Sequence, residues 1–254
     1  MSALSYLCDY GSNSEESDSE PIASYQRIDQ RLKLPAPDLS KVSVVPTEVH
    51  LDDPQLHSGR ARSFPHVRGN WATFVYVKCC ATDAISELIN KLIKCVLMKE
   101  DSCQRCDDLH ISLSRTFVLK YHLITSLSAS LQTALKDFEC FNLAFGDVQI
   151  FCNEENSRTF IALEVDPFIY KNFLSISKKV DEVLTDFQLP IFYEKPSYHM
   201  SILWVSGNRK AELHSILDNL NEILIENIAK FGHTVPVEKI SCKSGNKYFQ
   251  YLLQ

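Results

Sequence analysis

The chain has 254 residues, of which 45% are apolar and 23% charged, and it contains only 7 glycines. This composition excludes a collagen-like, low-complexity or wholly disordered chain. The formal net charge is −6, but residues 59–254 carry 22 basic and 22 acidic residues and are therefore neutral. A neutral domain lacks the many basic residues needed to wrap a long duplex, yet it can grip one or two nucleotides at a strand end.

The first 59 residues are expected to form an acidic, Ser- and Pro-containing tail without a packed core. Residues 11–20 are polar and acidic, and a segment without sustained periodicity follows, with prolines at positions 35, 37, 46 and 54. No apolar run reaches ~18 residues and no basic stretch precedes an apolar one, so neither a membrane span nor a secretory signal is expected. The nine cysteines are expected to stay reduced. We expect one folded domain over residues 60–254.

Strand and helix patterns alternate through this domain. A β-branched and aromatic run predicts a strand at 71–77, and apolar residues at i, i+3, i+4 spacing predict a helix at 83–98 with Asp83 in a capping position. The same criteria predict further strands at 109–113, 148–152, 158–165, 198–204, 235–242 and 247–252, and helices at about 121–138, 168–187 and 209–231. This mixture of strands and helices predicts the α+β class.

One arrangement occurs twice along the chain. A strand, a helix and a short strand beginning apolar-His-apolar-Ser fill residues 71–113 and again residues 158–204. Such an internal repeat indicates a diverged duplication. It predicts two related lobes, each made of strands and helices.

The two short strands carry the residues with the clearest chemistry. They read Leu-His-Ile-Ser-Leu from residue 109 and Tyr-His-Met-Ser-Ile from residue 198. Because side chains alternate along a strand, His110 and Ser112 share one face, as do His199 and Ser201. About 0.08 apolar-flanked motifs of this kind are expected by chance in this composition, and the chain has two. We expect the two pairs to face each other across a cleft.

Two facing imidazoles make an acid/base pair that works near neutral pH. One neutral histidine can take a proton from a nucleophile while a protonated one donates to the leaving group. A serine hydroxyl beside each could donate to a nonbridging phosphate oxygen. Neither serine lies in a Gly-x-Ser-x-Gly elbow, so a strong serine nucleophile is not indicated. The arrangement suits a substrate that brings its own nucleophile, as RNA does, and no cofactor or metal is expected.

These motifs resemble the two-histidine (2H) phosphoesterase superfamily and, within it, the U6 snRNA phosphodiesterase (Mpn1/USB) family. The resemblance implies two pseudo-symmetric lobes of antiparallel sheet flanked by helices, with the active-site cleft between them. It covers nearly all of residues 60–254 and none of the tail. The similar stretches are residues 62–73, 110–114, 158–165, 192–201 and 242–249.

The resemblance also implies an activity. Members of the family are 3′–5′ exoribonucleases that trim the 3′ oligo(U) or oligo(A) end of U6 snRNA in the nucleus, and a monomer is expected. The 2′-hydroxyl of the penultimate nucleotide would attack the last phosphodiester, releasing the terminal nucleoside and leaving a 2′,3′-cyclic phosphate. His110 and His199 match the family's acid/base histidines, and Ser112 and Ser201 match its phosphate-binding serines.

Further site residues follow from the same resemblance. Tyr193 matches a base-stacking tyrosine, and Pro196, Ser197 and Tyr198 match a loop that lines the nucleotide pocket. Stacking on Tyr193 would tolerate any base, because every base has a π-face. Glu154 takes the place of a uracil-contacting glutamine, and a carboxylate has no N–H to donate.

Several alternatives remain open at this point. The chain could be a 2′,3′-cyclic phosphodiesterase acting on RNA ends, or a non-catalytic RNA-binding module on the same fold. Cys103 and Cys106, followed by His110, could supply half a zinc site, although a second Cys/His pair is missing. Residues 243–247, with a lysine at each end, could contact phosphate or could simply turn a hairpin. The sequence does not assign which histidine is the acid and which the base.

Overall fold

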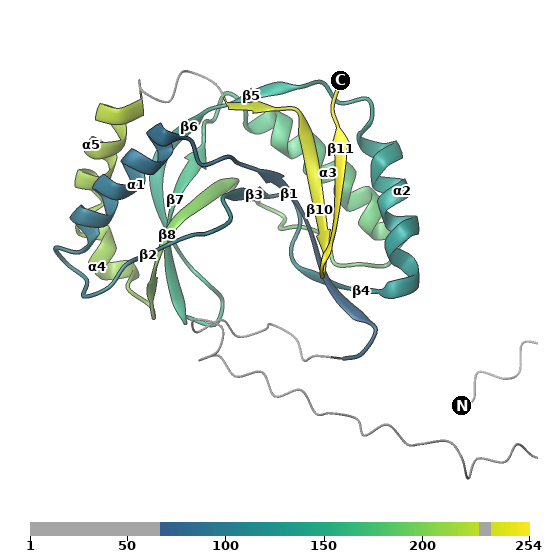
Figure 1. Cartoon of the computed structure of the whole chain (residues 1–254), viewed down its shortest axis with the longest axis horizontal. Helices are drawn as coiled ribbons and strands as arrows, with labels where there is room; N and C mark the ends of the chain where they lie inside the picture. Colours follow the sequence, from purple (N-terminus) through teal and green to yellow (C-terminus); the bar gives the residue numbers. More distant parts are fainter. Residues whose placement is uncertain (1–66, 229–234) are drawn as a thin grey trace, which may run out of the picture. The chain divides into compact units, whose positions relative to one another are not determined.

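The computed structural model describes residues 67–228 and 235–254, and the expected N-terminal tail lies outside these ranges. Figure 1 labels most of the elements. The helices are α1 (Asp83–Val96), the 3₁₀ helix η3 (Tyr121–Leu123), α2 (Ile124–Leu135), α3 (Tyr170–Asp186), α4 (Lys210–His214) and α5 (Leu217–Ile228). The strands are β1 (Asn70–Lys78), β2 (Gln104–Arg105), β3 (His110–Ser112), β4 (Phe117–Lys120), β5 (Phe141–Leu143), β6 (Phe145–Cys152), β7 (Arg158–Val165), β8 (His199–Ser206), β9 (Val235–Val237), β10 (Lys239–Ser244) and β11 (Lys247–Leu252).

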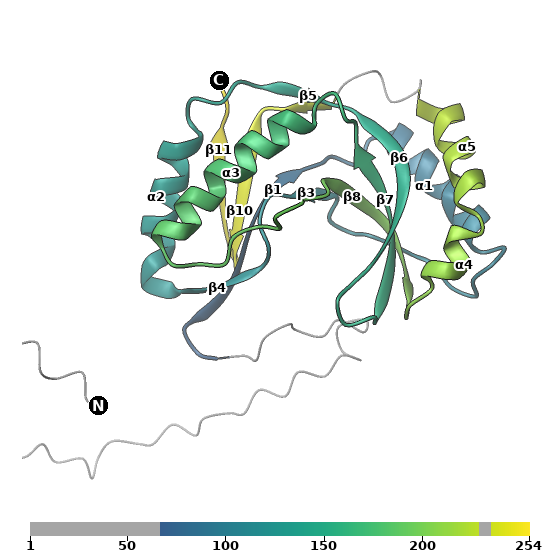
Figure 2. The same ribbon diagram turned by 180° about the vertical axis from the view of Figure 1, so that it is seen from behind.

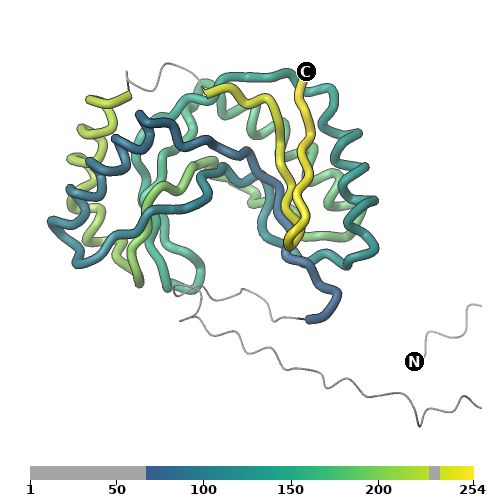
Figure 3. Tube along the Cα trace, in the orientation of Figure 1, coloured from purple at the N-terminus to yellow at the C-terminus, as the bar shows by residue number. Residues whose placement is uncertain are grey.

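An antiparallel sheet organises the described chain. Its strand order is β11-β10-β1-β3-β8-β7-β6, with β4 also paired to β1 and β2 to β8. Figure 3 shows the yellow hairpin β10–β11 beside the blue strand β1, although they come from opposite ends of the described chain. The strands β5 and β9 form a separate pair. Antiparallel strands with flanking helices confirm the α+β prediction.

The internal repeat has a direct structural counterpart. In the first copy β1 leads through α1 to β3 and pairs with it, and in the second copy β7 leads through α3 to β8 and pairs with it. The copies join at the middle of the sheet, where Ile111 of β3 lies opposite Met200 of β8. The two motif strands are therefore neighbours in one sheet.

Helices cover one face of this sheet and leave the other to the histidines. The helices α1 and α5 pack together against β8 and β6, and α2 packs against α3 and β11 (Figure 2). Val75, Ile111 and Met200 are fully buried on the covered face. Burying these branched and sulfur-containing side chains supplies the main stabilisation of each lobe. None of the described helices is long and apolar enough to cross a membrane.

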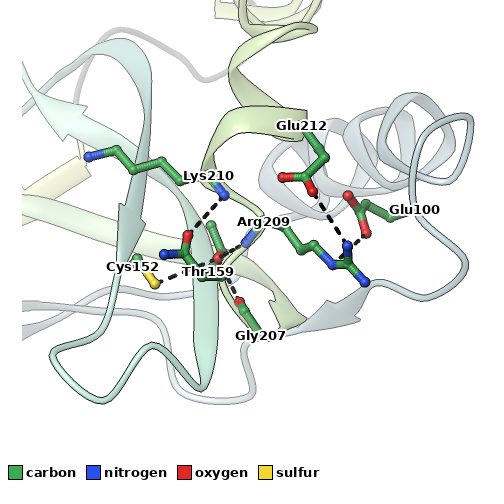
Figure 4. A network of polar contacts seen from close by, with 8 residues as sticks. Glu100, Cys152, Thr159, Gly207, Arg209, Lys210 and Glu212 are labelled. Carbon is green, nitrogen blue, oxygen red and sulfur yellow. Dashed lines mark hydrogen bonds and ion pairs between the residues drawn. The ribbon is translucent and has the colours of Figure 1, made fainter.

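Hydrogen bonds and ion pairs connect the segment after β8 to β7 and to the neighbouring helices (Figure 4). The buried Thr159 hydroxyl donates to the carbonyl of Gly207 at 2.8 Å and accepts from the backbone N–H of Arg209 at 2.8 Å. The Arg209 guanidinium forms ion pairs with Glu100, beyond the end of α1, and with Glu212 in α4. The network fixes the direction in which the chain leaves β8.

Two helix predictions need correction. The N-cap of α1 is Thr82, whose hydroxyl accepts from the N–H of Ile85, and Asp83 is the first helical residue. The helix predicted at 209–231 is two helices, because the N–H of Ser215 bonds to the carbonyl of Glu212 in an i→i+3 pattern that tightens the turn between α4 and α5. Its predicted last residues, 229–231, lie outside the described residues.

Three short strands were absent from the prediction. The strands β2, β4 and β5 have 2 to 4 residues each. Such lengths are too short to show a two-residue periodicity, so tertiary pairing decides them. The predicted strand at 235–242 is also divided into β9 and β10, which belong to different sheets.

Candidate active site

The four motif side chains lie on the sheet face that the helices leave uncovered. His110 and Ser112 of β3 are partly exposed while Ile111 between them is buried. His199 and Ser201 of β8 alternate with buried neighbours in the same way. The alternation that the sequence predicted is thus present in both strands.

The sheet register places these residues in a compact square. Because Ile111 lies opposite Met200 in an antiparallel pair, His110 comes beside Ser201 and Ser112 beside His199. The two histidines then occupy a diagonal, for which ~7–8 Å between backbone positions is typical. The sequence led us to expect the pairs to face each other across a cleft, whereas they are neighbours on adjoining strands. Two groups at this spacing can still bracket one phosphate.

Both imidazoles are fixed by the same backbone device. The Nδ1 atom of His110 lies 2.8 Å from the carbonyl oxygen of Asp108, and Nδ1 of His199 lies 2.8 Å from that of Ser197. A carbonyl oxygen only accepts, so each Nδ1 carries the hydrogen. The Nε2 atom of each ring is therefore the proton acceptor in the neutral form and the donor in the protonated form. Each histidine is prepared for either half of an acid/base reaction.

The rings around the histidines differ. Phe151 of β6 stacks on His199 with ring centroids 4.0 Å apart and an interplanar angle of 17°. Phe74 and Tyr76 of β1 pack against His110 at 5.8 and 5.5 Å. Burial lowers the pKa of His199 below its usual 6.5, and the nearby His110 lowers it further, although the bond to the Ser197 carbonyl opposes this. His199 is therefore biased toward its neutral form.

A cavity of about 850 Å³ begins at two of the four motif residues. It is lined by His110 and Ser201, by Trp204 and by residues of the hairpin β10–β11. This volume lies toward the upper end of the roughly 300–1,000 Å³ that small-molecule sites occupy. The site therefore has room for more than the reacting phosphate.

A second cluster joins three loops near the motif strands. Tyr193 is half exposed, and the guanidinium of Arg115 lies over its ring, 4.9 Å from the centroid. The same guanidinium forms an ion pair with Glu154 at 3.2 Å. Two of the residues that the resemblance named are thus linked through Arg115, which the sequence analysis missed. Its one sequence signal is its position three residues after Ser112.

The remaining loop residues do not share one role. Pro196 and Ser197 are partly exposed, and the carbonyl of Ser197 holds the His199 ring. Tyr198 requires a correction, because it is 1% exposed and lies on the opposite face from His199, bonded through its hydroxyl to Ser177 of α3. Burial raises its pKa to about 12. Tyr198 therefore supports the core under the loop and cannot line a nucleotide pocket from this position.

The thiol of Cys103 belongs to the Cys103/Cys106 pair considered above as half a zinc site. Burial and the neighbouring Cys106 and Glu100 raise the pKa of Cys103 to about 11, so its protonated form is favoured when no metal is bound. Within residues 67–228 and 235–254, no group of three or more His, Cys, Asp or Glu side chains is placed to hold a metal ion.

Comparison with known proteins places the chain among its relatives. A family model described as an uncharacterised conserved protein (HVSL) matches residues 32–251. U6 snRNA phosphodiesterase 1 of Drosophila melanogaster is 36% identical over 260 residues, which cover 98% of this chain and 99% of the fly protein. The Homo sapiens protein of the same name is 35% identical over 236 residues, 88% of this chain and 85% of its own.

The chain belongs to the U6 snRNA phosphodiesterase 1 family. Its fold agrees with a solved structure of Kluyveromyces marxianus Usb1, with a TM-score of 0.52 over 72% of this chain and 98% of that one, at 13% identity. The resemblance to the U6 snRNA phosphodiesterase family is therefore confirmed, and the chain shares the fold of Usb1.

Proposed function

We propose that this chain is a nuclear 3′–5′ exoribonuclease that trims the 3′ oligo(U) or oligo(A) end of U6 snRNA. The observation that carries the proposal is the pair of imidazoles on neighbouring strands, each with Nδ1 bonded to a carbonyl and Nε2 left for the substrate. We infer the RNA substrate from the name of the relatives, U6 snRNA phosphodiesterase 1.

The reaction needs two proton transfers around one phosphorus atom. The 2′-hydroxyl of the penultimate nucleotide gives its proton to one Nε2 and forms a new O–P bond. The bond from phosphorus to the 5′-oxygen of the terminal nucleoside breaks, and this oxygen takes a proton from the other Nε2. The products are a free nucleoside and an RNA ending in a 2′,3′-cyclic phosphate. The proposed reaction requires no metal ion.

The surrounding residues suggest which histidine is the base, which is the acid, and which residues bind the substrate. Burial favours the neutral, proton-accepting form of His199, so we assign it the role of base and His110 the role of acid. Ser112 and Ser201 each lie beside a histidine and would donate hydrogen bonds to the nonbridging oxygens as negative charge grows there. The terminal base would stack on the ring of Tyr193, which the Arg115 guanidinium also contacts.

The first prediction tests the acid/base roles. Alanine at His110 or at His199 should lower kcat for trimming of a uridine-ended RNA by about 100- to 10,000-fold, the usual contribution of a general acid or base. The matched control is His122→Ala, which removes an exposed histidine from η3. Circular dichroism should report a folded protein in all three variants. Full activity in either motif variant would contradict the assigned roles.

The competing functions predict different products. A cyclic phosphodiesterase would open an RNA that already ends in a 2′,3′-cyclic phosphate, and a binding module would turn over neither substrate. The wild-type chain is incubated with the uridine-ended RNA and, separately, with the RNA that ends in a cyclic phosphate. Identifying the product termini by mass spectrometry separates the three functions.

A further inference from the structure

The cavity beside the histidine pair extends well beyond the reacting residues. Its lining runs from His110 and Ser201 to the hairpin β10–β11. Tyr193, Ser197 and His199, all among the described residues, lie outside this lining. We propose that the cavity binds the single-stranded RNA on the 5′ side of the scissile phosphate. This inference rests on the proposed function, which assigns the terminal nucleoside to the loop of Tyr193.

The sheet register connects the far end of the cavity to the catalytic face. Lys243 of β10 pairs with Phe74 of β1 on one side and with Tyr248 of β11 on the other. The ring of Phe74 in turn packs against His110. Because cross-strand partners point to the same side of a sheet, Lys243 and Tyr248 share the face of the histidines. Both line the cavity.

Lys243 and Tyr248 combine the two groups that single-stranded RNA requires. Tyr248 is 63% exposed, so its ring is open to a ligand. The Lys243 ammonium lies 5.2 Å from the centroid of this ring. An aromatic face stacks on any base, and an adjacent ammonium neutralises the phosphate that follows it. Contacts of this kind bind single-stranded RNA regardless of its base sequence.

A buried hydroxyl in the same lining also lacks a partner. Ser241 is 3% exposed, lines the cavity, and its Oγ has no hydrogen-bond partner among the described residues. Tyr76, the cross-strand partner of Ser241 on β1, lies close enough for this hydroxyl to oppose the rise that burial causes in the Tyr76 pKa. A buried polar group without a partner is unfavourable. A ribose hydroxyl or a phosphate oxygen in the cavity would satisfy it.

The charged residues that line the cavity favour an RNA path toward the hairpin β10–β11. Asp107 and Asp108, before β3, and Glu155, in the turn between β6 and β7, line other parts of the cavity and repel phosphate. Lys78 lies beside His110, at the reacting end. Arg158, the third basic residue of the lining, is buried with its guanidinium over the Trp204 ring. We therefore assign the phosphate upstream of the scissile one to Lys243, which lies beside the exposed ring of Tyr248. One such contact predicts a change of ~0.7 in the slope of log Kd against log salt concentration.

The same hairpin provides a matched control. Lys247 pairs with Ser244, one position along from Lys243, so it points to the opposite side of the sheet. Its ammonium lies 4.6 Å from the ring centroid of Tyr121 and outside the cavity lining. Replacing Lys247 removes the same charge from the same hairpin without touching the cavity.

The activity test compares the dinucleotide UpU with an eight-nucleotide oligo(U), using the full chain. The ratio of kcat/KM for the octamer to that for the dinucleotide should fall about 10-fold in Tyr248→Ala and in Lys243→Ala. Tyr248→Phe, which keeps the aromatic face, and Lys247→Ala should both keep the wild-type ratio. An unchanged ratio in the two alanine variants would overturn the proposal, and so would an equal fall in Lys247→Ala.

A binding measurement separates failure of this inference from failure of the proposed function. Fluorescence anisotropy with an octamer carrying 2′-deoxyribose at the penultimate position requires no cleavage. Lys243→Ala should bind more weakly, with a salt slope smaller by ~0.7. If the wild type cleaves neither RNA but binds the octamer more tightly than Lys243→Ala does, the cavity binds RNA and the proposed function fails. If it cleaves both and Lys243→Ala binds like the wild type, the cavity proposal alone fails.

Discussion

At the scale of single residues, the site depends on how two imidazole rings are held. Each ring donates from Nδ1 to the carbonyl two residues before it, Asp108 for His110 and Ser197 for His199. The His-x-Ser spacing could be read from the sequence, because strand alternation alone puts each pair on one face. The carbonyl contacts could not, since they depend on the backbone path just before each strand. Arg115 was missed for a similar reason, because its partners come from two distant loops.

The lowered pKa of His199 predicts how stability depends on pH. Unfolded histidine titrates near 6.5 and folded His199 titrates below that, so between the two values the unfolded chain binds more protons. The free energy of unfolding should therefore fall as the pH drops below about 6.5. In His199→Gln this part of the decrease should be absent, whereas His214→Gln, at an exposed position in α4, should keep it. Urea unfolding at a series of pH values measures both, and the same decrease in His199→Gln would contradict the assigned burial.

At the scale of elements, length decided what the sequence could predict. Long periodic segments such as α1 and α3 were predicted within a few residues of their bounds. The three-residue strand β3 was found because its motif marked it, and β1 and β8 on its two sides hold it in place. The strands β2 and β4 contain no such motif. They form because β2 pairs with β8 and β4 pairs with β1.

The turn between β10 and β11 gives a prediction at this scale. Gly245 has φ = +57°, and a Cβ atom there would lie 2.3 Å from the indole ring of Trp71. Gly245→Ala should therefore lower the free energy of unfolding by about 1–3 kcal/mol, through strain and steric overlap together. Gly207→Ala is the matched control, because Gly207 has φ = +78° with nothing within 4 Å of the added atom. Thermal unfolding of both variants should show the larger loss at Gly245, and equal losses would contradict the steric account.

At the scale of the whole described chain, a repeated strand–helix–strand unit brings together residues far apart in sequence. The sequence indicated the repeat and the α+β class, and both are confirmed. It did not indicate that the copies join edge to edge through Ile111 and Met200, because pairing between distant strands leaves no local pattern. That junction puts each histidine beside the serine of the other copy. The site is therefore shared between the halves of the domain.

The most direct test of the account uses the nucleophile itself. A uridine-ended RNA and a matched RNA with 2′-deoxyribose at the penultimate nucleotide are incubated with the chain in EDTA, and the products are identified by mass spectrometry. We expect the first RNA to lose a nucleoside and gain a 2′,3′-cyclic phosphate, and the second to remain intact. Efficient cleavage of the deoxy-substituted RNA would mean that water attacks the phosphate, and the mechanism built on His110 and His199 would be wrong.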